Sequence, residues 1–128
     1  MPEINEVDNA LMTACRGIRG ATTADANTEE AIHAAAAELV EALIDANGLE
    51  EDSLAAVFFT MTPDLDAAFP ATAARRLAWA NAPLVDITQV AVKGSLPRCI
   101  RILILVNTDK DQKDLVFKYL KGAKDLRT

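Results

Sequence analysis

Hydrophobic and polar positions form their clearest pattern between residues 83 and 107, where they predict two strands joined by a short turn at residues 93–95. In the second strand the even-numbered apolar residues share one face of the pleat: Ile100, Ile102, Ile104 and Val106. The odd-numbered residues line the other face. Arg101 therefore lies among apolar neighbours, in a strand that we expect to be buried on both faces.

A buried guanidinium is costly unless an anion meets it. From this strand alone two explanations of Arg101 stay open. One is an internal salt bridge with an Asp or Glu, which is the commoner arrangement for a buried charge. The other is an anionic ligand.

The rest of the pattern predicts a strand near residues 15–23, a helix from about residue 28 to Asn47, a buried strand over residues 54–60, a helix over residues 70–80 and a last helix that ends near Gly122. This order, β-α-β-α-β-β-α, predicts an α+β fold, a mixed β-sheet with helices on one face. No second set of helices is available for the other face. We therefore expect that face to associate into a closed ring of identical subunits.

Two Arg-Gly pairs, at Arg16-Gly17 and Arg19-Gly20, place arginines on opposite faces of the first predicted strand. The glycines would let another backbone or a ligand come close. From this segment alone, one solvated arginine and one surface ion pair are the simpler explanation.

Composition narrows the function classes. The chain has 128 residues, about one domain, and a net charge of -6 without a Lys/Arg run, so we expect no nucleic-acid partner. Cys15, Cys99 and the single His33 form no metal-ligand pattern, so we expect no metal. The first residues are acidic where a signal peptide is basic, and no run reaches the roughly 18 apolar residues of a membrane span. The expected compartment is the cytoplasm, without membrane association.

Four segments together resemble one family: RGIRGATT at 16–23, TPDL at 62–65, FPA at 69–71 and GSLPRCIR at 94–101. The tail, with Tyr119 and Leu126-Arg127, belongs to the same pattern. Over residues 15–128 the chain resembles the AroH-type chorismate mutases, which are monofunctional and trimeric. Residues 1–14 would then be an N-terminal extension. The resemblance implies the trimeric pseudo-α/β-barrel of the Bacillus type.

The resemblance also implies the reaction, an intramolecular [3,3] rearrangement of chorismate to prephenate on the route to phenylalanine and tyrosine. This chemistry uses no cofactor, nucleophile or proton shuttle. It needs a compact substrate conformer and stabilisation of the charge that develops as the ether C–O bond breaks. The substrate is a dianion, and planar arginine forks match carboxylates.

Site residues follow from the resemblance position by position. Arg19 and Arg101 match two substrate-binding arginines, Arg101 donating to the ether oxygen, and Tyr119 matches a tyrosine that contacts a substrate carboxylate. The neighbouring subunit would lend Phe69, Ala71 and Arg75. The tail residues Leu126 and Arg127 would order over the ligand. Four more substrate contacts are implied beside Asp86: Leu84, Val85, Ile87 and Thr88.

The chain departs from the family at three positions. Thr72 stands where the family has a lysine. Asp86 and Gln89 stand where the family has a cysteine and, three residues later, a glutamate that binds the substrate hydroxyl. We expect Asp86 to take over the carboxylate role while Gln89 keeps a neutral hydrogen bond. The alternative is that Asp86 merely pairs with Arg101 and impairs the enzyme.

Two other functions stay open at this point. A non-catalytic trimer that binds a carboxylate metabolite would bind ligand without turnover. An imine deaminase of the RidA type, whose fold is similar, would turn over an enamine or imine but not chorismate. The tail pattern and residues 16–23 argue against the deaminase.

Overall fold

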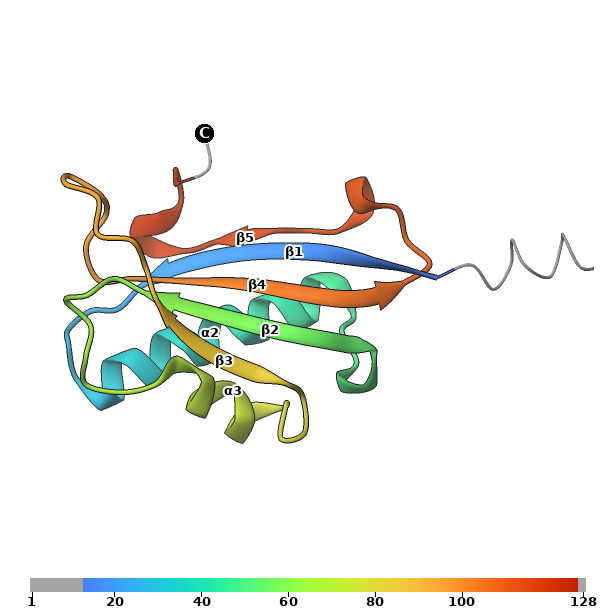
Figure 1. Ribbon diagram of the computed structural model, residues 1–128, viewed down its shortest axis with the longest axis horizontal. Helices are drawn as coiled ribbons and strands as arrows, with labels where there is room; N and C mark the ends of the chain where they lie inside the picture. Colours follow the sequence, from blue (N-terminus) through green and yellow to red (C-terminus); the bar gives the residue numbers. More distant parts are fainter. Residues whose placement is uncertain (1–12, 127–128) are drawn as a thin grey trace, which may run out of the picture.

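The computed structural model describes residues 13–126. Its helices and strands, in chain order, are β1 (Ala14–Thr23), α2 (Glu29–Asn47), β2 (Leu54–Met61), α3 (Pro70–Leu77), β3 (Leu84–Thr88), β4 (Cys99–Thr108) and β5 (Lys118–Tyr119). Three short 3-10 turns complete it: η1 (Glu51–Ser53), η2 (Gln112–Asp114) and η3 (Lys121–Ala123). Figure 1 shows the five strands side by side and both helices on the same side of them.

The sheet has the strand order β3-β2-β4-β1-β5. Its central strand, β4, runs antiparallel to β1 and β2, whereas β3 is parallel to β2 and β5 is parallel to β1. The predicted α+β fold with a mixed sheet is therefore confirmed.

Helix α2 begins and ends where its sequence predicts. The Thr28 hydroxyl accepts a hydrogen bond from the Ala31 amide at 3.1 Å, and Gly48 closes the helix in the left-handed conformation with φ of 61°. Its buried residues follow helical spacing: Ile32, Ala35, Ala36, Leu39, Val40, Leu43 and Asn47. Neither helix within residues 13–126 is long and apolar enough to cross a membrane.

The core lies between the helices and one face of the sheet. Strands β1, β2 and β4 supply its larger side chains from positions that face α2 and α3: Ile18, Val57, Phe59, Ile100, Ile102, Ile104 and Val106. The second face keeps apolar side chains in solvent, among them Leu103, Val85 and Ile87, which are 38%, 44% and 46% exposed. We call this second face the open face. The expectation that β4 is buried on both faces is therefore wrong for the single chain.

The predicted hairpin between the last two long strands is also wrong. Strand β3 pairs with β2 and has no ladder to β4. The reason is α3, which connects β2 to β3 and provides the crossover that parallel neighbours require. The ten residues from Gln89 to Arg98 then form a loop that returns the chain to β4.

The last predicted helix is replaced by η2, β5 and η3. The Gln112 side chain accepts from the Gly17 amide at 3.0 Å and donates to the Gly17 carbonyl, while the Leu120 amide donates to the Ala21 carbonyl at 2.9 Å. The Asn47 side chain bonds both backbone groups of Val116. These partners satisfy the backbone in an extended path along β1, so the apolar spacing here belongs to an edge segment rather than to a helix.

Candidate active site

One residue from each strand lies in a row across the open face. Tyr119 is opposite Ala21, Ala21 is opposite Arg101, Arg101 is opposite Thr60, and Thr60 is opposite Ile87. Partners in a ladder point to the same face of a sheet. Five strands that are far apart in the sequence therefore place these side chains together.

Arg19 joins this row from the neighbouring position of β1, opposite Leu103. A hollow of about 530 Å³, the arginine hollow, is lined by Arg19, Phe58, Thr60, Ile87, Arg101, Ile102 and Leu103. Two cations thus share an otherwise largely apolar wall. Such a wall lowers the local dielectric and strengthens the pull of each guanidinium on an anion.

No carboxylate within residues 13–126 forms a salt bridge with Arg19 or Arg101, since the ion pair found in this part of the chain joins Lys121 to Asp25 at 3.5 Å. The internal salt bridge that was open for Arg101 is therefore not formed here. Three polar atoms of the central row are buried without a hydrogen-bond partner in the described chain: Arg101 Nε, Thr60 Oγ1 and Tyr119 Oη. Buried polar atoms are normally paired, so this cluster favours a ligand rich in oxygen.

Cys99 precedes Arg101 by two residues on β4, so both side chains lie on the same face of the sheet. Burial raises the pKa of the Cys99 thiol, and a hydrogen bond with the Arg101 guanidinium opposes the rise. The thiol is fully buried, so it is available to hold one edge of the guanidinium rather than to react with solutes.

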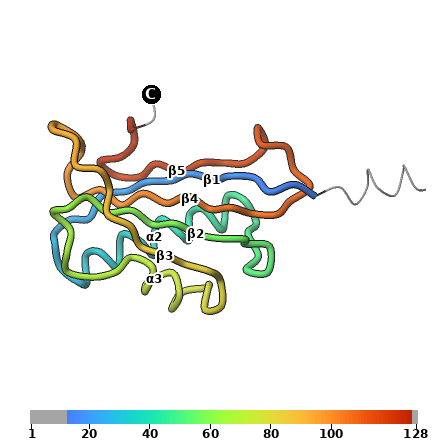
Figure 2. The backbone as a smooth tube through the Cα atoms, viewed as in Figure 1, coloured from blue at the N-terminus to red at the C-terminus, as the bar shows by residue number. Residues whose placement is uncertain are grey.

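Tyr119 and Leu126 gather at the same end of the sheet. They pack against the buried trio Ala21, Cys99 and Ala123. In Figure 2 the C-terminal segment and the loop between β3 and β4 lie at this end. The structure thus brings the tail near Arg101 as far as Leu126, whereas Arg127 lies outside the described residues.

Asp86 lies on the other face of the sheet. It is opposite Phe59, whose side chain belongs to the core, and its Oδ1 accepts the Ala71 amide at 3.0 Å. Burial raises the pKa of the Asp86 carboxyl, while the bond to Ala71 and the charge of Arg75 oppose the rise. In the single chain Asp86 therefore neither pairs with Arg101 nor faces the arginine hollow.

Phe69 and Ala71 lie at the start of α3, and Arg75 lies in its last turn. Pro70 opens this helix, while Phe69 stands before it and is 67% exposed. Phe69, Asp86, Ile87 and Thr88 line part of a second hollow of about 280 Å³, the Phe69 hollow. Ile87 is common to both hollows. The predicted site is thus split into two halves on one chain.

The remaining predicted contacts are distributed between these halves. Val85 is exposed beside Ile87 on the open face, whereas Leu84 pairs with Val57 and faces the helices. The Gln89 amide donates to the Met61 carbonyl at 2.8 Å, which extends the ladder of β3. Gln89 Oε1 is buried and has no partner in the part of the chain that the structure describes.

The sequence analysis missed how the start of β4 is held. The Thr62 hydroxyl donates to the Asp64 carboxylate and accepts the Cys99 amide at 3.0 Å. Asp64 also accepts the Arg98 amide at 2.9 Å, and Arg98 adopts a positive φ of 48°. The bond from Thr62 holds the pKa of Asp64 below its usual value. This network fixes the strand that carries Arg101.

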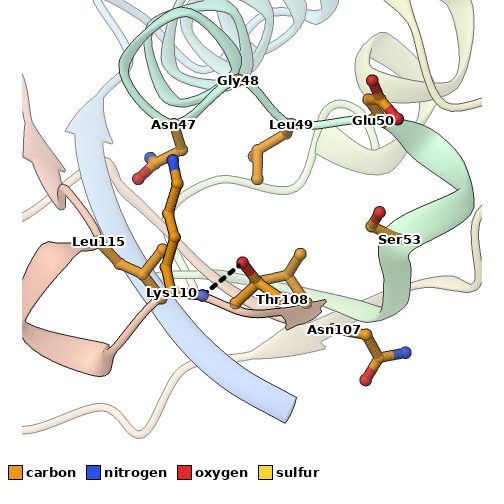
Figure 3. Close-up of a pocket in the computed structure, with 10 residues that line it drawn as sticks. Asn47, Gly48, Leu49, Glu50, Ser53, Asn107, Thr108, Lys110 and Leu115 are labelled. Carbon is orange, nitrogen blue, oxygen red and sulfur yellow. Dashed lines mark hydrogen bonds between the residues drawn. The ribbon is translucent and has the colours of Figure 1, made fainter. Parts of the chain in front are cut away.

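A separate hollow of about 120 Å³ lies at the far end of β4, where α2 ends (Figure 3). The Lys110 amide donates to the Thr108 hydroxyl at 3.2 Å, and Asn47 closes one side. None of the predicted site residues lines it, so the candidate site stays with the arginine hollow and the Phe69 hollow.

Comparisons with known proteins show which family the chain resembles. The family model described as chorismate mutase type I matches residues 15–128. The chain is 50% identical over 113 residues to the chorismate mutase AroH of Thermus thermophilus, covering 88% of this chain and 93% of that protein. It is 38% identical over 113 residues to the Bacillus subtilis chorismate mutase AroH, covering 88% and 89%. A solved chorismate mutase from Clostridium thermocellum matches with a TM-score of 0.83 and 49% identity, over 85% of this chain and 97% of that one.

Proposed function

The chain belongs to the chorismate mutase type I family and has that family's activity, and we propose that it rearranges chorismate to prephenate in a site built on the arginine hollow. It is an isomerase of aromatic amino acid biosynthesis. The observation that carries the proposed site is the pairing of Arg19 with Arg101 in one hollow, where no described carboxylate neutralises either cation.

Arg101 has the role that matters most for the rate. During the [3,3] shift the ether C–O bond breaks while a C–C bond forms, and no external electron or proton is required. Negative charge grows on the ether oxygen in the transition state. A guanidinium held at that oxygen stabilises the transition state more than the ground state, which is the condition for catalysis.

Arg19 and Tyr119 bind the carboxylates. They lie on the same side of Arg101 in the strand order, Arg19 on the adjacent strand β1 and Tyr119 on the edge strand β5, so the substrate would span the three strands. Holding both ends of the flexible ether selects its compact conformer and supplies the positional part of the rate enhancement. Leu126 and Arg127 would cover this end once ligand is bound.

The second half of the site would come from a neighbouring copy. The open face carries exposed Leu103, Val85 and Ile87, and Phe69 projects into solvent, which favours burial against another subunit. A ring of three would place the Phe69 hollow of one copy, with Ala71 and Arg75, over the arginine hollow of the next. Light scattering should then give a mass of three 13.7 kDa chains, and a stable monomer would contradict the shared site.

Gln89 is proposed to meet the substrate hydroxyl. Its Oε1 is a buried acceptor without a partner in the described chain, and a hydroxyl donor would satisfy it. Asp86, by contrast, is engaged with Ala71 on the helix-covered face. Its placement favours an anchoring role for the Phe69 segment over the substrate-binding role predicted from the sequence.

The direct test is the loss of chorismate absorbance with purified protein and no added cofactor, with prephenate identified as the product. Saturable conversion is expected, and it should persist with a chelator because no step uses a metal. Ligand binding without conversion would instead support the carboxylate-binding alternative. The family match and the fold give no support to the imine deaminase alternative.

A further inference from the structure

Thr60 and Arg101 occupy directly opposite positions on β2 and β4. Both side chains belong to the wall of the arginine hollow. Arg101 Nε is a buried donor without a partner in the described chain, and Thr60 Oγ1 is a buried hydroxyl without one. A donor and an acceptor that both lack partners in the described chain therefore belong to residues directly paired on adjacent strands.

We propose that Thr60 is a positioning residue for Arg101, its hydroxyl accepting the Nε–H when substrate draws the guanidinium into the hollow. The inference rests on the proposed function, because it assigns the bond to the substrate-bound state. Thr60 Oγ1 is shielded from solvent, so it is placed to act through Arg101 rather than on the substrate itself.

The geometry of a guanidinium explains why such a bond matters. Its donors lie in one rigid plane, so fixing Nε fixes the direction of both terminal nitrogens. Cys99 holds Arg101 from the same strand, and Thr60 would hold it from the next strand. Bonds on two sides would aim the terminal nitrogens at the ligand space shared with Arg19. Preorganised donors stabilise developing charge without reorganisation during the reaction.

Replacing the hydroxyl with a methyl group tests this role. Thr60→Val keeps the shape and strand preference of the side chain but removes the acceptor, whereas Thr60→Ser keeps the hydroxyl. Thr22→Val is the matched control. Thr22 Oγ1 is also buried and finds no partner among residues 13–126, but Thr22 is opposite Ile100 on the helix-covered face. Thr60→Ala serves as the second variant if the valine protein does not fold.

The expected result is a loss of about tenfold to a hundredfold in kcat for Thr60→Val, the range for one hydrogen bond to a charged group, with a smaller change in KM. Thr60→Ser should stay within about threefold of the unmodified protein, and Thr22→Val should keep its kcat. In an Arg101→Lys background, which has no Nε, Thr60→Val should add no further loss.

An unchanged kcat in both Thr60→Val and Thr60→Ala would overturn the inference. So would a loss of the same size in the Arg101→Lys background, because the hydroxyl would then act without Nε. If the unmodified protein itself converts no chorismate, the proposed function fails first and this inference fails with it. If the unmodified protein converts chorismate and the Thr60 variants keep its kcat, the inference is rejected while the proposed function stands.

Discussion

The hydrogen bond between Asp86 and Ala71 allows a direct test of whether the Asp86 carboxylate has a structural or a catalytic role. Ala71 is 1% exposed, so its amide has no access to water if the 3.0 Å bond to Asp86 is removed. In Asp86→Ala that amide would be buried without a partner. In Asp86→Asn the amide oxygen of the new side chain can still accept the bond.

An unpaired buried amide costs about 1–3 kcal/mol. For a chain of 128 residues, each kcal/mol corresponds to about 3–6 °C in Tm. We therefore expect Asp86→Ala to lower Tm by roughly 3–18 °C and to raise KM, since Phe69 precedes the anchored turn of α3. Asp86→Asn should keep kcat within about threefold.

The pH dependence of stability shows whether the negative charge of Asp86 stabilises or destabilises the fold. Folding raises the pKa of Asp86, so the ionised form is less favourable in the native state than in the unfolded state. This penalty is present above the native pKa and disappears as the pH falls through it toward the ordinary value of 3.8. Asp86→Asn should therefore gain stability relative to the unmodified protein near neutral pH, and the gain should shrink on acidification.

Thermal melts at several pH values and steady-state chorismate kinetics on both variants provide the assay. The reasoning is refuted if Asp86→Asn keeps the Tm of the unmodified protein but loses a hundredfold or more in kcat. That result would mean that the charge of Asp86 acts on the substrate, as the sequence alone suggested.

Three further predictions concern the frame of the site. Gly20→Ala should lower the free energy of unfolding by about 1–3 kcal/mol in chemical denaturation, because a Cβ there would lie 3.0 Å from the Lys118 carbonyl and 3.1 Å from Leu43; unchanged stability would mean that this contact relaxes. Asp64→Asn should lower Tm near neutral pH, and the difference should shrink as the pH falls from the ordinary carboxyl value of 3.8 through the lowered pKa of Asp64. A pH-independent difference would contradict this. Ile87→Asp should abolish the proposed trimer in light scattering and with it turnover, and an active monomer would disprove the shared site.

Much of the fold could be predicted from local pattern. Helix α2 carries its own boundary signals at Thr28 and Gly48, and its buried stripe repeats at helical spacing. The alternation from Ile100 to Val106 predicted that these residues share one face of β4, and that face enters the core. Each of these signals lies within one segment, which is why sequence reasoning finds them.

The errors share one physical cause, because each depends on a partner from a distant segment. The apolar spacing around Leu115 predicts a helix. In the structure, hydrogen bonds with Gly17 and Asn47 hold this part of the chain as an edge segment instead. The short turn predicted at residues 93–95 would join neighbouring antiparallel strands, but α3 makes β3 the parallel neighbour of β2.

Side-chain roles at the site depend on register in the same way. Arg19 and Arg101 share the open face only because β1 and β4 pair with the observed offset. A shift by one residue would send either guanidinium to the helices. Asp86 shows the opposite case, since its parity on β3 turns its carboxylate away from the arginine hollow. Thr60 has no signal in sequence beyond its place in a strand, and it becomes visible only through its unpartnered oxygen opposite Arg101.

The most direct measurement of the central claim is the kcat of Arg101→Ala with chorismate, beside the unmodified protein and Arg16→Ala. Arg16 is the matched control, because it lies on β1 but on the opposite face from Arg19. Removing one preorganised donor should lower kcat by about a hundredfold or more in Arg101→Ala, while Tm and Arg16→Ala activity stay close to those of the unmodified protein. A folded Arg101→Ala protein with undiminished turnover would show that the reaction does not take place in the arginine hollow.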